Sequence, residues 1–406
     1  MTSSNSEPLQ RTAVRPLKAC MLAYTFYEND GRVMRYAEAL VQEGMEVEAI
    51  VLGRPGQARE EIIHGVKVLR VQTREKNERD KFAYLWRIVK FFFVSMLAIG
   101  SRHLRAPYDI VHVHSVPDFE VFAAIVPKLG GAKLILDIHD IVPEFYAAKF
   151  GVEVESITFK ALKLVEKWST GFADHVIVAN DLWMDKIATR ATLRDKCSSF
   201  INYPDVSVFH PRLRTRRADD RFVLSYPGTL NWHQGLDIAI RAFAKALREA
   251  PEMEFHIHGE GSAKPELSRL VDALGLQGKV VLHAPLPLRE IALVMANADL
   301  GVVPKRNDAF GGDAFSTKIL EFMALGVPVV VARTRIDDHY FDDSLLRFFT
   351  PDDDTQLAQA MLDAYRRRDH SSERASRALE FVGLNNWGAR KGRYLRIVEE
   401  LVRGTP

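Results

Sequence analysis

Short apolar runs alternate with longer amphipathic stretches along most of this chain. In the first half the runs are KACMLAY, VEAIVLG, DIVHVHS, KLILDIHD and HVIVAN, and most are separated by helical patterns such as RVMRYAEALVQEG. In the second half the pattern restarts with RFVLSYPG, MEFHIHGEG, KVVLHAP, DLGVVPK and VPVVVA. Strands that alternate with helices in this way form parallel sheets covered on both faces. The pattern predicts an α/β protein with two doubly wound, Rossmann-like domains.

A Pro-rich and charged stretch, INYPDVSVFHPRLRTRRADD, separates the two patterns. This composition is typical of a linker, and 406 residues are enough for two separate cores. We therefore expect a loose polar tail and then two domains joined by a linker, with a final helix after the second domain. The expected ranges are 1–17 for the tail, 18–205 for the first domain, 206–220 for the linker, 221–385 for the second domain and 386–406 for the helix.

The loops that follow the strands are the expected place for chemistry. Ligands of open parallel sheets bind beyond the carboxyl ends of the strands, so two facing domains would bind them in one interdomain cleft. Gly228, Gly259 and Gly261 follow predicted strands and would let the backbone approach a phosphate. Such glycines are also common in ordinary turns. The first strand leads to Gly31 alone rather than to G-x-G-x-x-G, which disfavours a nicotinamide or flavin enzyme.

Composition narrows the class of protein further. With 47% hydrophobic and 27% charged residues, the chain has the composition of a soluble globular protein. Its net charge of +2 gives no reason to expect a nucleic-acid partner. Cys20 and Cys197 are the only cysteines, which excludes a disulfide framework and indicates a reducing, cytoplasmic compartment.

The longest apolar run, FFFVSMLAI, is too short to span a bilayer but lies in a basic region. Residues 67–105 contain ten Lys and Arg residues but only three Asp and Glu residues. The more common structure for such a run is a core helix whose charged ends reach water. The alternative is a helix, over residues 82–105, that lies on the anionic inner face of a membrane.

The stretch FSTKILEFMALGVPVVV predicts a short buried helix with a carboxylate in its middle. Ser316 or Thr317 is a suitable N-cap and Gly326 a suitable stop. Lys318 and Glu321 are three residues apart and share a face. A surface ion pair of this kind contributes only about 0.2–0.5 kcal/mol. A cation and a carboxylate beside glycine loops would instead suit phosphates and sugar hydroxyls.

The segment DAFSTKILEFMALGVPVVV resembles the donor-site motif of retaining glycosyltransferases of the group 1 type, family 4, which share the two-domain GT-B fold. The resemblance extends over nearly the whole chain, to NNWGARKGRYLRIVEELV near its end. It implies transfer of a sugar, with retention, from a UDP- or GDP-sugar to a hydroxyl of a glycan or lipid-linked acceptor. It also implies a role in surface polysaccharide or glycolipid assembly, with no metal or other cofactor.

The resemblance also implies roles for individual residues. Glu321 would bind the ribose hydroxyls, Asp313 would lie near the donor sugar and phosphates, and Lys318 would neutralise the departing diphosphate. His139 would approach the transferred sugar, although a strand-end histidine can equally be structural. The other expected substrate contacts are Gly31, Arg32 and Asp140 in the first half, and Gly228, Thr229, Asn231, His233, Gly259, Gly261, Ala284, Phe315, Ser316 and Thr317 in the second.

One departure from the family pattern affects the phosphate site. Many relatives carry an Arg and a Lys where this chain has Thr229 and Gln234. The diphosphate charge would then be met by Lys318, Lys305, Arg306, helix amides or His233. Weaker donor binding, or loss of activity, would follow if these groups did not suffice.

Two further functions stay open at this point. The chain could be a non-catalytic nucleotide-sugar-binding partner in a glycan-assembly complex, or a nucleotide-sugar epimerase. A metal enzyme is disfavoured because the acidic run PDDDTQ is explained by a helix N-cap.

Overall fold

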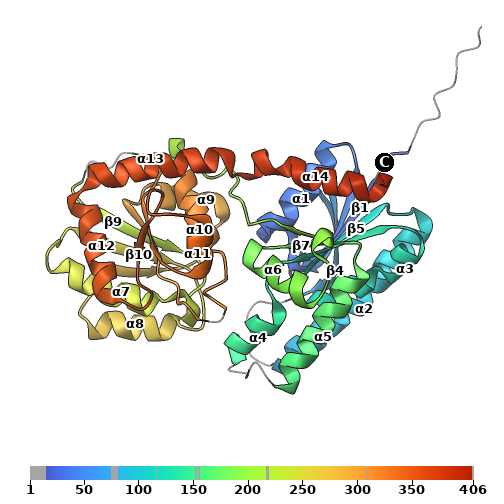
Figure 1. Cartoon of the computed structure of the whole chain (residues 1–406), viewed down its shortest axis with the longest axis horizontal. Helices are drawn as coiled ribbons and strands as arrows, with labels where there is room; N and C mark the ends of the chain where they lie inside the picture. The colour runs from blue at the N-terminus through green and yellow to red at the C-terminus, as the bar shows by residue number, and fades with distance from the viewer. Residues whose placement is uncertain are drawn as a thin grey trace, which may run out of the picture. The chain divides into compact units, whose positions relative to one another are not determined.

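The computed structural model describes residues 15–74, 81–115, 117–150, 153, 156–215, 219–308 and 310–404 (Figure 1). Its strands form a sheet of eight strands from the first half of the chain and a sheet of six strands from the second. Strands and helices alternate in both halves, so the predicted α/β class is confirmed. Residues 1–14 of the predicted tail and 216–218 of the predicted linker lie outside the described residues.

The first sheet has the strand order β3-β4-β2-β1-β5-β6-β7-β8. β1 pairs in parallel with β2 and β5, whereas β3 and β4 form an antiparallel pair. Strand β5 is buried along its whole length, as expected for a central strand of a sheet covered on both faces, and it buries His112 and His114 with its apolar residues. The strands are β1 (Lys18–Phe26), β2 (Glu46–Gly53), β3 (Glu60–Ile63), β4 (Val66–Thr73), β5 (Ile110–Ser115), β6 (Lys133–Ile138), β7 (His175–Val178) and β8 (Cys197–Ser199).

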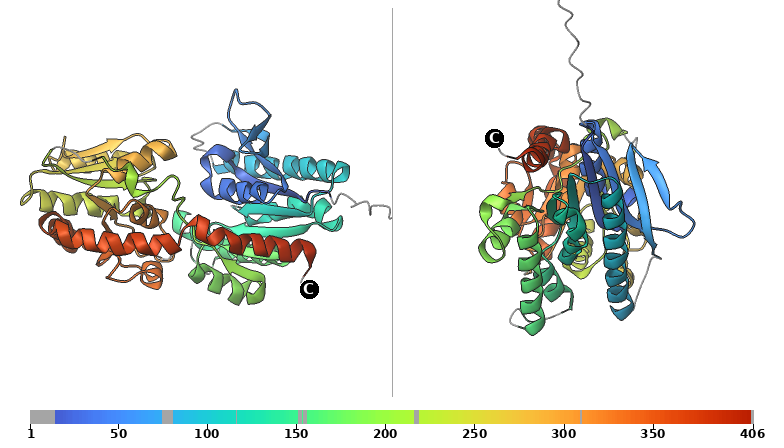
Figure 2. Two further views of the ribbon diagram at one scale, coloured as in Figure 1. Left: turned by 90° about the horizontal axis from the view of Figure 1, so that it is seen from above. Right: turned by 90° about the vertical axis from the view of Figure 1, so that its right-hand side faces the viewer.

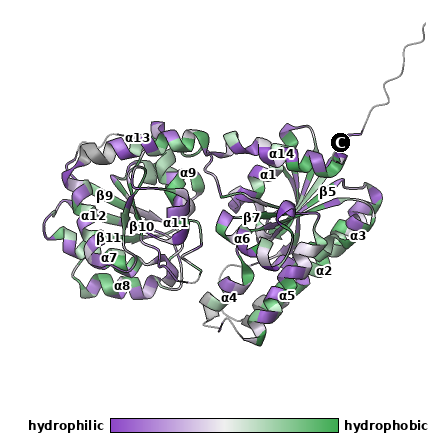
Figure 3. Ribbon diagram, viewed as in Figure 1, coloured by the Kyte–Doolittle hydropathy of each residue, from purple (hydrophilic) through white to green (hydrophobic). Residues whose placement is uncertain are grey.

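The helices of the first half begin where side chains can cap them. Asp30, Ser156 and Asn180 each accept a hydrogen bond from a backbone amide in the first turn of the helix that follows. Hydrophilic and hydrophobic residues both occur along these helices, as expected for helices packed on a sheet (Figure 3). The helices are α1 (Gly31–Gln42), α2 (Lys81–Arg105), α3 (Ile125–Leu129), α4 (Val142–Phe150), α5 (Ile157–Phe172) and α6 (Asp181–Arg190).

The second sheet is parallel, with the strand order β11-β10-β9-β12-β13-β14. Successive side chains of its strands enter two different cores, because Val302 and Val330 pack in one cluster and Val303 and Val331 in another. Both faces are therefore covered by helices (Figure 2). The strands are β9 (Phe222–Pro227), β10 (Met253–His258), β11 (Val280–His283), β12 (Leu300–Val303), β13 (Val329–Ala332) and β14 (Arg347–Phe349).

The helices of the second half include the one predicted after PDDD. The Asp353 carboxylate accepts hydrogen bonds from the amides of Thr355 and Gln356 at 3.0 and 2.8 Å, so the predicted N-cap is confirmed. The helices are α7 (Leu236–Leu247), α8 (Lys264–Ala273), α9 (Leu288–Ala296), α10 (Thr317–Ala324), α11 (Arg335–Tyr340), α12 (Asp354–Arg366), α13 (Arg368–Leu384) and α14 (Trp387–Arg403).

Packing divides the chain into two compact units. One contains the chain up to His114 with residues 120–135 and the end of the chain from Val398, and the other contains residues 115–119 and 136–397. The last turns of α14 thus belong to the first unit. The domain boundaries that the sequence suggests remain predictions.

Candidate functional site

The N-terminus of α10 is the centre of the candidate site. The helix begins at Thr317 with Ser316 at its N-cap, as predicted, but within the described ranges no side chain caps it. The Ser316 hydroxyl is buried, and the described residues offer it no hydrogen-bond partner. The amides of a first turn lack helical partners and carry the positive end of the helix dipole. This helix end is therefore suited to an anion such as a phosphate.

Lys318 brings a positive charge to the same helix end. Its Nζ lies 3.5 Å from Gln234 Oε1 and 5.1 Å from the centre of the Tyr226 ring. Its side chain passes so close to Gly228 that a Cβ there would collide with Lys318 Cε. Gly228 also has a φ of 140°, which favours glycine. Glycine at this strand end thus makes room for the lysine.

Burial controls the charge state of Lys318. Burial lowers the pKa of Lys318 to about 8, the charge of Glu321 raises it and the charge of Lys305 lowers it. An anion bound beside the ammonium group would favour the charged form. Glu321 lies three residues further along α10 and is half-buried.

Thr229 and Gln234, the two departures from the family pattern, serve the structure of the loop. The Tyr226 hydroxyl lies 2.9 Å from both the Thr229 carbonyl oxygen and Gln234 Oε1. His233 is a poor replacement for the missing charge, because burial lowers the pKa of His233 and so disfavours its charged form.

Lys305 and Arg306 are already matched by carboxylates. Arg306 makes two hydrogen bonds of 2.8 Å to Asp237 and stacks on Trp232, with its guanidinium carbon 3.9 Å from the ring centre. Lys305 Nζ lies 2.9 Å from Asp337. Among Lys305, Arg306 and Lys318, the cations that the sequence suggests for the diphosphate, Lys318 is the one without a carboxylate at ion-pair distance among the described residues.

Two other predicted glycines allow loops to pack against each other. A Cβ on Gly259 would collide with the carbonyl oxygen of Gly228, and one on Gly261 with that of Leu230. The loops after β9 and β10 therefore lie side by side, and the approach of these glycines to a phosphate remains a prediction. In the same loops the Ser262 hydroxyl donates to Asn231 Oδ1 at 3.4 Å. The predicted contact Ala284 lies just after β11 and is exposed.

The loop before α10 is held from several sides. Asp313 is fully buried, Lys186 Nζ lies 2.6 Å from its Oδ2, and Arg335 pairs with its other oxygen. Asn180 Nδ2 donates to the Asp313 carbonyl oxygen at 3.0 Å. The aromatic ring of Phe315 packs edge-on against that of Tyr340, with 5.2 Å between their centres. Lys186 and Arg335 were not predicted, because nothing near them in the sequence indicates this contact.

The N-terminus of α1, where Gly31 and Arg32 were expected to contact substrate, is capped by a side chain, unlike that of α10 in the described part of the chain. The Asp30 carboxylate accepts hydrogen bonds of 3.2 Å from the amides of Arg32 and Val33, so it already occupies this helix end. The Arg32 side chain is buried, with its guanidinium carbon 5.9 Å from the centre of the Tyr36 ring. A Cβ on Gly31 would meet no atom of the described chain within 4 Å. Asp30, rather than Gly31, determines the chemistry of this helix end.

His139 follows β6 and is oriented by a carboxylate. Its Nε2 lies 3.2 Å from Oδ2 of Asp137, which is completely buried, and Asp140 follows at the start of the loop. Asp137 was not singled out from the sequence. Side chains two residues apart in a strand share a face, and this periodicity in DIHD could have identified it.

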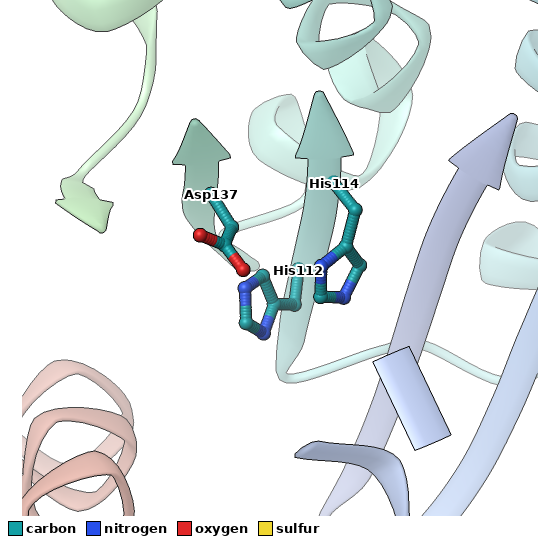
Figure 4. A group of neighbouring side chains, drawn as sticks. All are labelled: His112, His114 and Asp137. Atoms are coloured by element: carbon teal, nitrogen blue, oxygen red, sulfur yellow. The ribbon is translucent and has the colours of Figure 1, made fainter. Parts of the chain in front are cut away.

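Asp137 also lies close to two buried histidines of β5. The His112 ring lies beside the Asp137 carboxylate and the His114 ring lies next to that of His112, and one potential ligand atom of each of the three residues lies within 4.8 Å of the others (Figure 4). The two imidazole rings are stacked with 4.2 Å between their centres. Two imidazoles and a carboxylate can bind a transition metal, whereas the sequence gives no reason to expect one.

Comparison with known families identifies the class of protein. Residues 31–197 match the glycosyl transferase 4-like domain, and residues 221–367 match the glycosyl transferases of group 1. The chain belongs to the group 1 glycosyltransferases with the GT-B fold.

Individual relatives agree with this assignment. A D-inositol 3-phosphate glycosyltransferase of Thermomonospora curvata is 25% identical over 395 residues, which are 90% of this chain and 88% of that protein. An alpha-D-kanosaminyltransferase of Streptomyces kanamyceticus is 25% identical over 250 residues, or 58% of this chain and 63% of that protein.

Solved structures share the fold at low identity. Sucrose-phosphate synthase from Thermosynechococcus elongatus superposes with a TM-score of 0.77 at 16% identity, covering 96% of this chain and all of the other. HepE of Anabaena in complex with UDP gives a TM-score of 0.71 at 15% identity, covering 95% of this chain and all of the other.

Proposed function

We propose that this glycosyltransferase moves a sugar, with retention at the anomeric carbon, from a nucleotide diphosphate sugar to a hydroxyl group. The observation that carries the proposal is the uncapped N-terminus of α10, within the described residues, with Lys318 beside it. Helix amides and a half-buried ammonium group would together stabilise a diphosphate, and the departing nucleoside diphosphate is where negative charge develops in this reaction.

Other residues would divide the remaining work. Glu321 would accept hydrogen bonds from the ribose hydroxyls, and His139, held by Asp137, would bind a hydroxyl of the transferred sugar. No protein nucleophile is assigned. The acceptor would attack from the face of the leaving phosphate, which would take the acceptor's proton as the bond to the sugar breaks.

We propose UDP as the first nucleotide to test, with GDP beside it. Crystal structures of Anabaena HepE contain UDP and UDP-glucose, which supports UDP for a chain with the same fold. The acceptor would be a glycan or lipid-linked hydroxyl in polysaccharide or glycolipid assembly at the inner face of the membrane. Lysine and helix amides would supply the charge stabilisation without a metal.

Turnover of a sugar donor tests the proposal. The protein would be incubated with UDP- and GDP-sugars and a set of hydroxyl acceptors, while release of the nucleoside diphosphate is recorded. Proton NMR of the product would give the anomeric configuration, and an inverted product would contradict the retaining mechanism. Binding of a donor without turnover of any acceptor would favour the non-catalytic partner, and isomerised donor would favour an epimerase.

We expect nucleoside diphosphate binding to depend on the charge of Lys318. Because the pKa of Lys318 is about 8, its amino group is protonated and positively charged below that pH and loses this charge above it. The dissociation constant for UDP, measured by calorimetry, should therefore rise about tenfold or more between about pH 7 and about pH 9.5. Lys318→Met should bind weakly at both values. A flat profile for the wild-type protein would contradict the assignment.

Helix α2 offers a surface for membrane contact. Ile88, Phe91 and Ile99 on one side are buried, which agrees with a core helix. Four large apolar side chains on the other side are exposed and recur every seven or four residues, so they form one stripe along the helix. They are Trp86, Phe93, Leu97 and Leu104, with exposed fractions between 52 and 77%.

The charge of α2 suits an anionic lipid surface. Its sequence contains no Asp or Glu, and the basic residues Lys90 and Arg105 are exposed. Arg102 is engaged with Glu48 and Glu60, at 3.1 and 2.6 Å. Within the described part of the chain, no helix is long and apolar enough to cross a membrane. We propose that the stripe lies in the interface of an anionic membrane. Side chains of 82–84, in the stretch predicted for this contact, lie outside the described residues.

Vesicle binding would test the α2 stripe. Trp86→Ser combined with Leu97→Ser should lower co-sedimentation with vesicles containing phosphatidylglycerol about tenfold or more, because two apolar side chains no longer enter the interface. Leu129→Ser is the matched control, since Leu129 on α3 is 84% exposed outside the stripe. Equal binding by the double variant and the wild-type protein would exclude the membrane assignment. If sedimentation velocity shows that the wild-type protein is a dimer and the double variant a monomer, the stripe would instead be a contact with a second copy of the chain.

A further inference from the structure

A buried ion pair lies behind the loop that leads into α10. Lys305 follows β12, and its side chain is 5% exposed. Its Nζ lies 2.9 Å from Oδ2 of Asp337, which is completely buried in α11. The Thr334 hydroxyl donates to the same carboxylate oxygen at 2.5 Å. The other oxygen, Oδ1, has no partner within the described ranges.

Burying the Lys305 and Asp337 charges costs free energy that their mutual attraction only partly offsets. The pair is therefore better explained by the orientation that it imposes on its neighbours than by its contribution to stability. Burial lowers the pKa of Lys305 and raises the pKa of Asp337, while each charge favours the charged form of the other. Buried ion pairs often stabilise a protein no more than apolar side chains of similar volume would. Their hydrogen bonds, however, fix the groups around them in one orientation.

The group that Lys305 orients is a peptide unit of the candidate site. Lys305 Nζ donates a hydrogen bond of 2.8 Å to the carbonyl oxygen of Ala314. In a trans peptide the carbonyl and the next N–H point in opposite directions. The bond to Lys305 therefore turns the N–H of Phe315 away from Lys305. Phe315 directly precedes the uncapped Ser316, so its amide belongs to the same helix entrance.

We propose that Lys305 is a positioning residue that, paired with Asp337, holds the 314–315 peptide with its N–H toward the diphosphate of the donor. The inference rests on the proposed function, because it assigns a support to the same phosphate site. Without this bond the peptide can turn over and present a carbonyl oxygen, which repels a phosphate. Lys305 would thus act through the backbone rather than by touching the substrate.

The test compares a nucleoside with its diphosphate. Lys305→Met should weaken binding of UDP, or of GDP if that is the nucleotide bound by the wild-type protein, about 10- to 100-fold, as expected for loss of a hydrogen bond to a charged group. Binding of uridine or guanosine should change less than about threefold, because neither carries a phosphate. Equal losses for nucleoside and diphosphate would indicate a merely structural role and overturn the inference.

A charge-balanced variant guards against misfolding. Lys305→Met combined with Asp337→Asn leaves no unpaired buried charge and keeps an acceptor for Thr334, so it should fold, which thermal unfolding would verify. It should still lose affinity for the diphosphate, and recovery of wild-type affinity would overturn the inference. If the wild-type protein binds neither UDP nor GDP, the proposed function fails first. If it binds one and both variants bind that nucleotide equally well, the positioning role alone fails.

Discussion

Replacement of Lys318 with methionine should lower kcat for sugar transfer by roughly 100- to 1000-fold, the usual cost of removing one group that stabilises developing charge. Lys318 is the cation beside the N-terminus of α10, while Lys305 and Arg306 are paired with carboxylates. Methionine keeps most of the side-chain volume in the space that Gly228 provides. The measurement is steady-state release of nucleoside diphosphate at saturating donor.

Two controls separate a chemical effect from a structural one. Lys245→Met removes an exposed lysine that pairs with Asp354, and it should leave turnover unchanged. Thermal unfolding of Lys318→Met should show a folded protein, because methionine keeps most of the side-chain volume and Glu321, which loses a neighbouring positive charge, is only half-buried. If Lys318→Met keeps more than about a tenth of the wild-type kcat, the charge-stabilising role is wrong.

Replacement of Glu321 with alanine should weaken nucleotide binding about 10- to 100-fold, because a carboxylate that accepts hydrogen bonds from ribose hydroxyls contributes about 1.5–3 kcal/mol. The loss should be similar for the nucleoside and its diphosphate, since the ribose is common to both. This equal loss distinguishes Glu321 from Lys318 and Lys305, whose replacement should affect the diphosphate selectively. Calorimetry with both ligands gives the comparison.

The control for Glu321 is Glu249→Ala on the surface. Glu249 pairs with Arg366, and both side chains are about half exposed, so its loss should not change nucleotide affinity. Glu321→Gln should fall between wild type and Glu321→Ala, because the amide oxygen still accepts a hydrogen bond without the charge. Unchanged affinity in Glu321→Ala would remove the ribose assignment.

The sequence predicts most of the fold because most of the strands it identifies are buried on both faces and are therefore rich in apolar residues. KLILDIHD and VPVVVA are examples, and they form β6 and β13. The unpredicted strands β3, β4, β8 and β14 lie at the edges of the sheets or next to them, and three of them are short. Edge strands such as Cys197–Ser199 bury little side-chain surface and leave a weak apolar pattern.

The candidate site is predicted unevenly for a related reason. The start and stop of α10 are local features that the sequence identifies, although the Ser316 side chain does not cap the helix. The partners of Asp313 and Lys305 come from distant positions, Lys186 and Asp337, which local patterns do not connect. Asp30 is local, and its role could have been predicted, because aspartate is a common N-cap residue.

The central claim is that the N-terminus of α10, with Lys318, binds the diphosphate of a nucleotide. Thermal unfolding with UDP and with GDP tests it most directly, because a ligand at about 100 times its dissociation constant stabilises the folded state by roughly 2.7 kcal/mol. One of the two nucleotides should raise the melting temperature of the wild-type protein and have little effect on Lys318→Met. No rise with either nucleotide, or an equal rise in Lys318→Met, would contradict the claim.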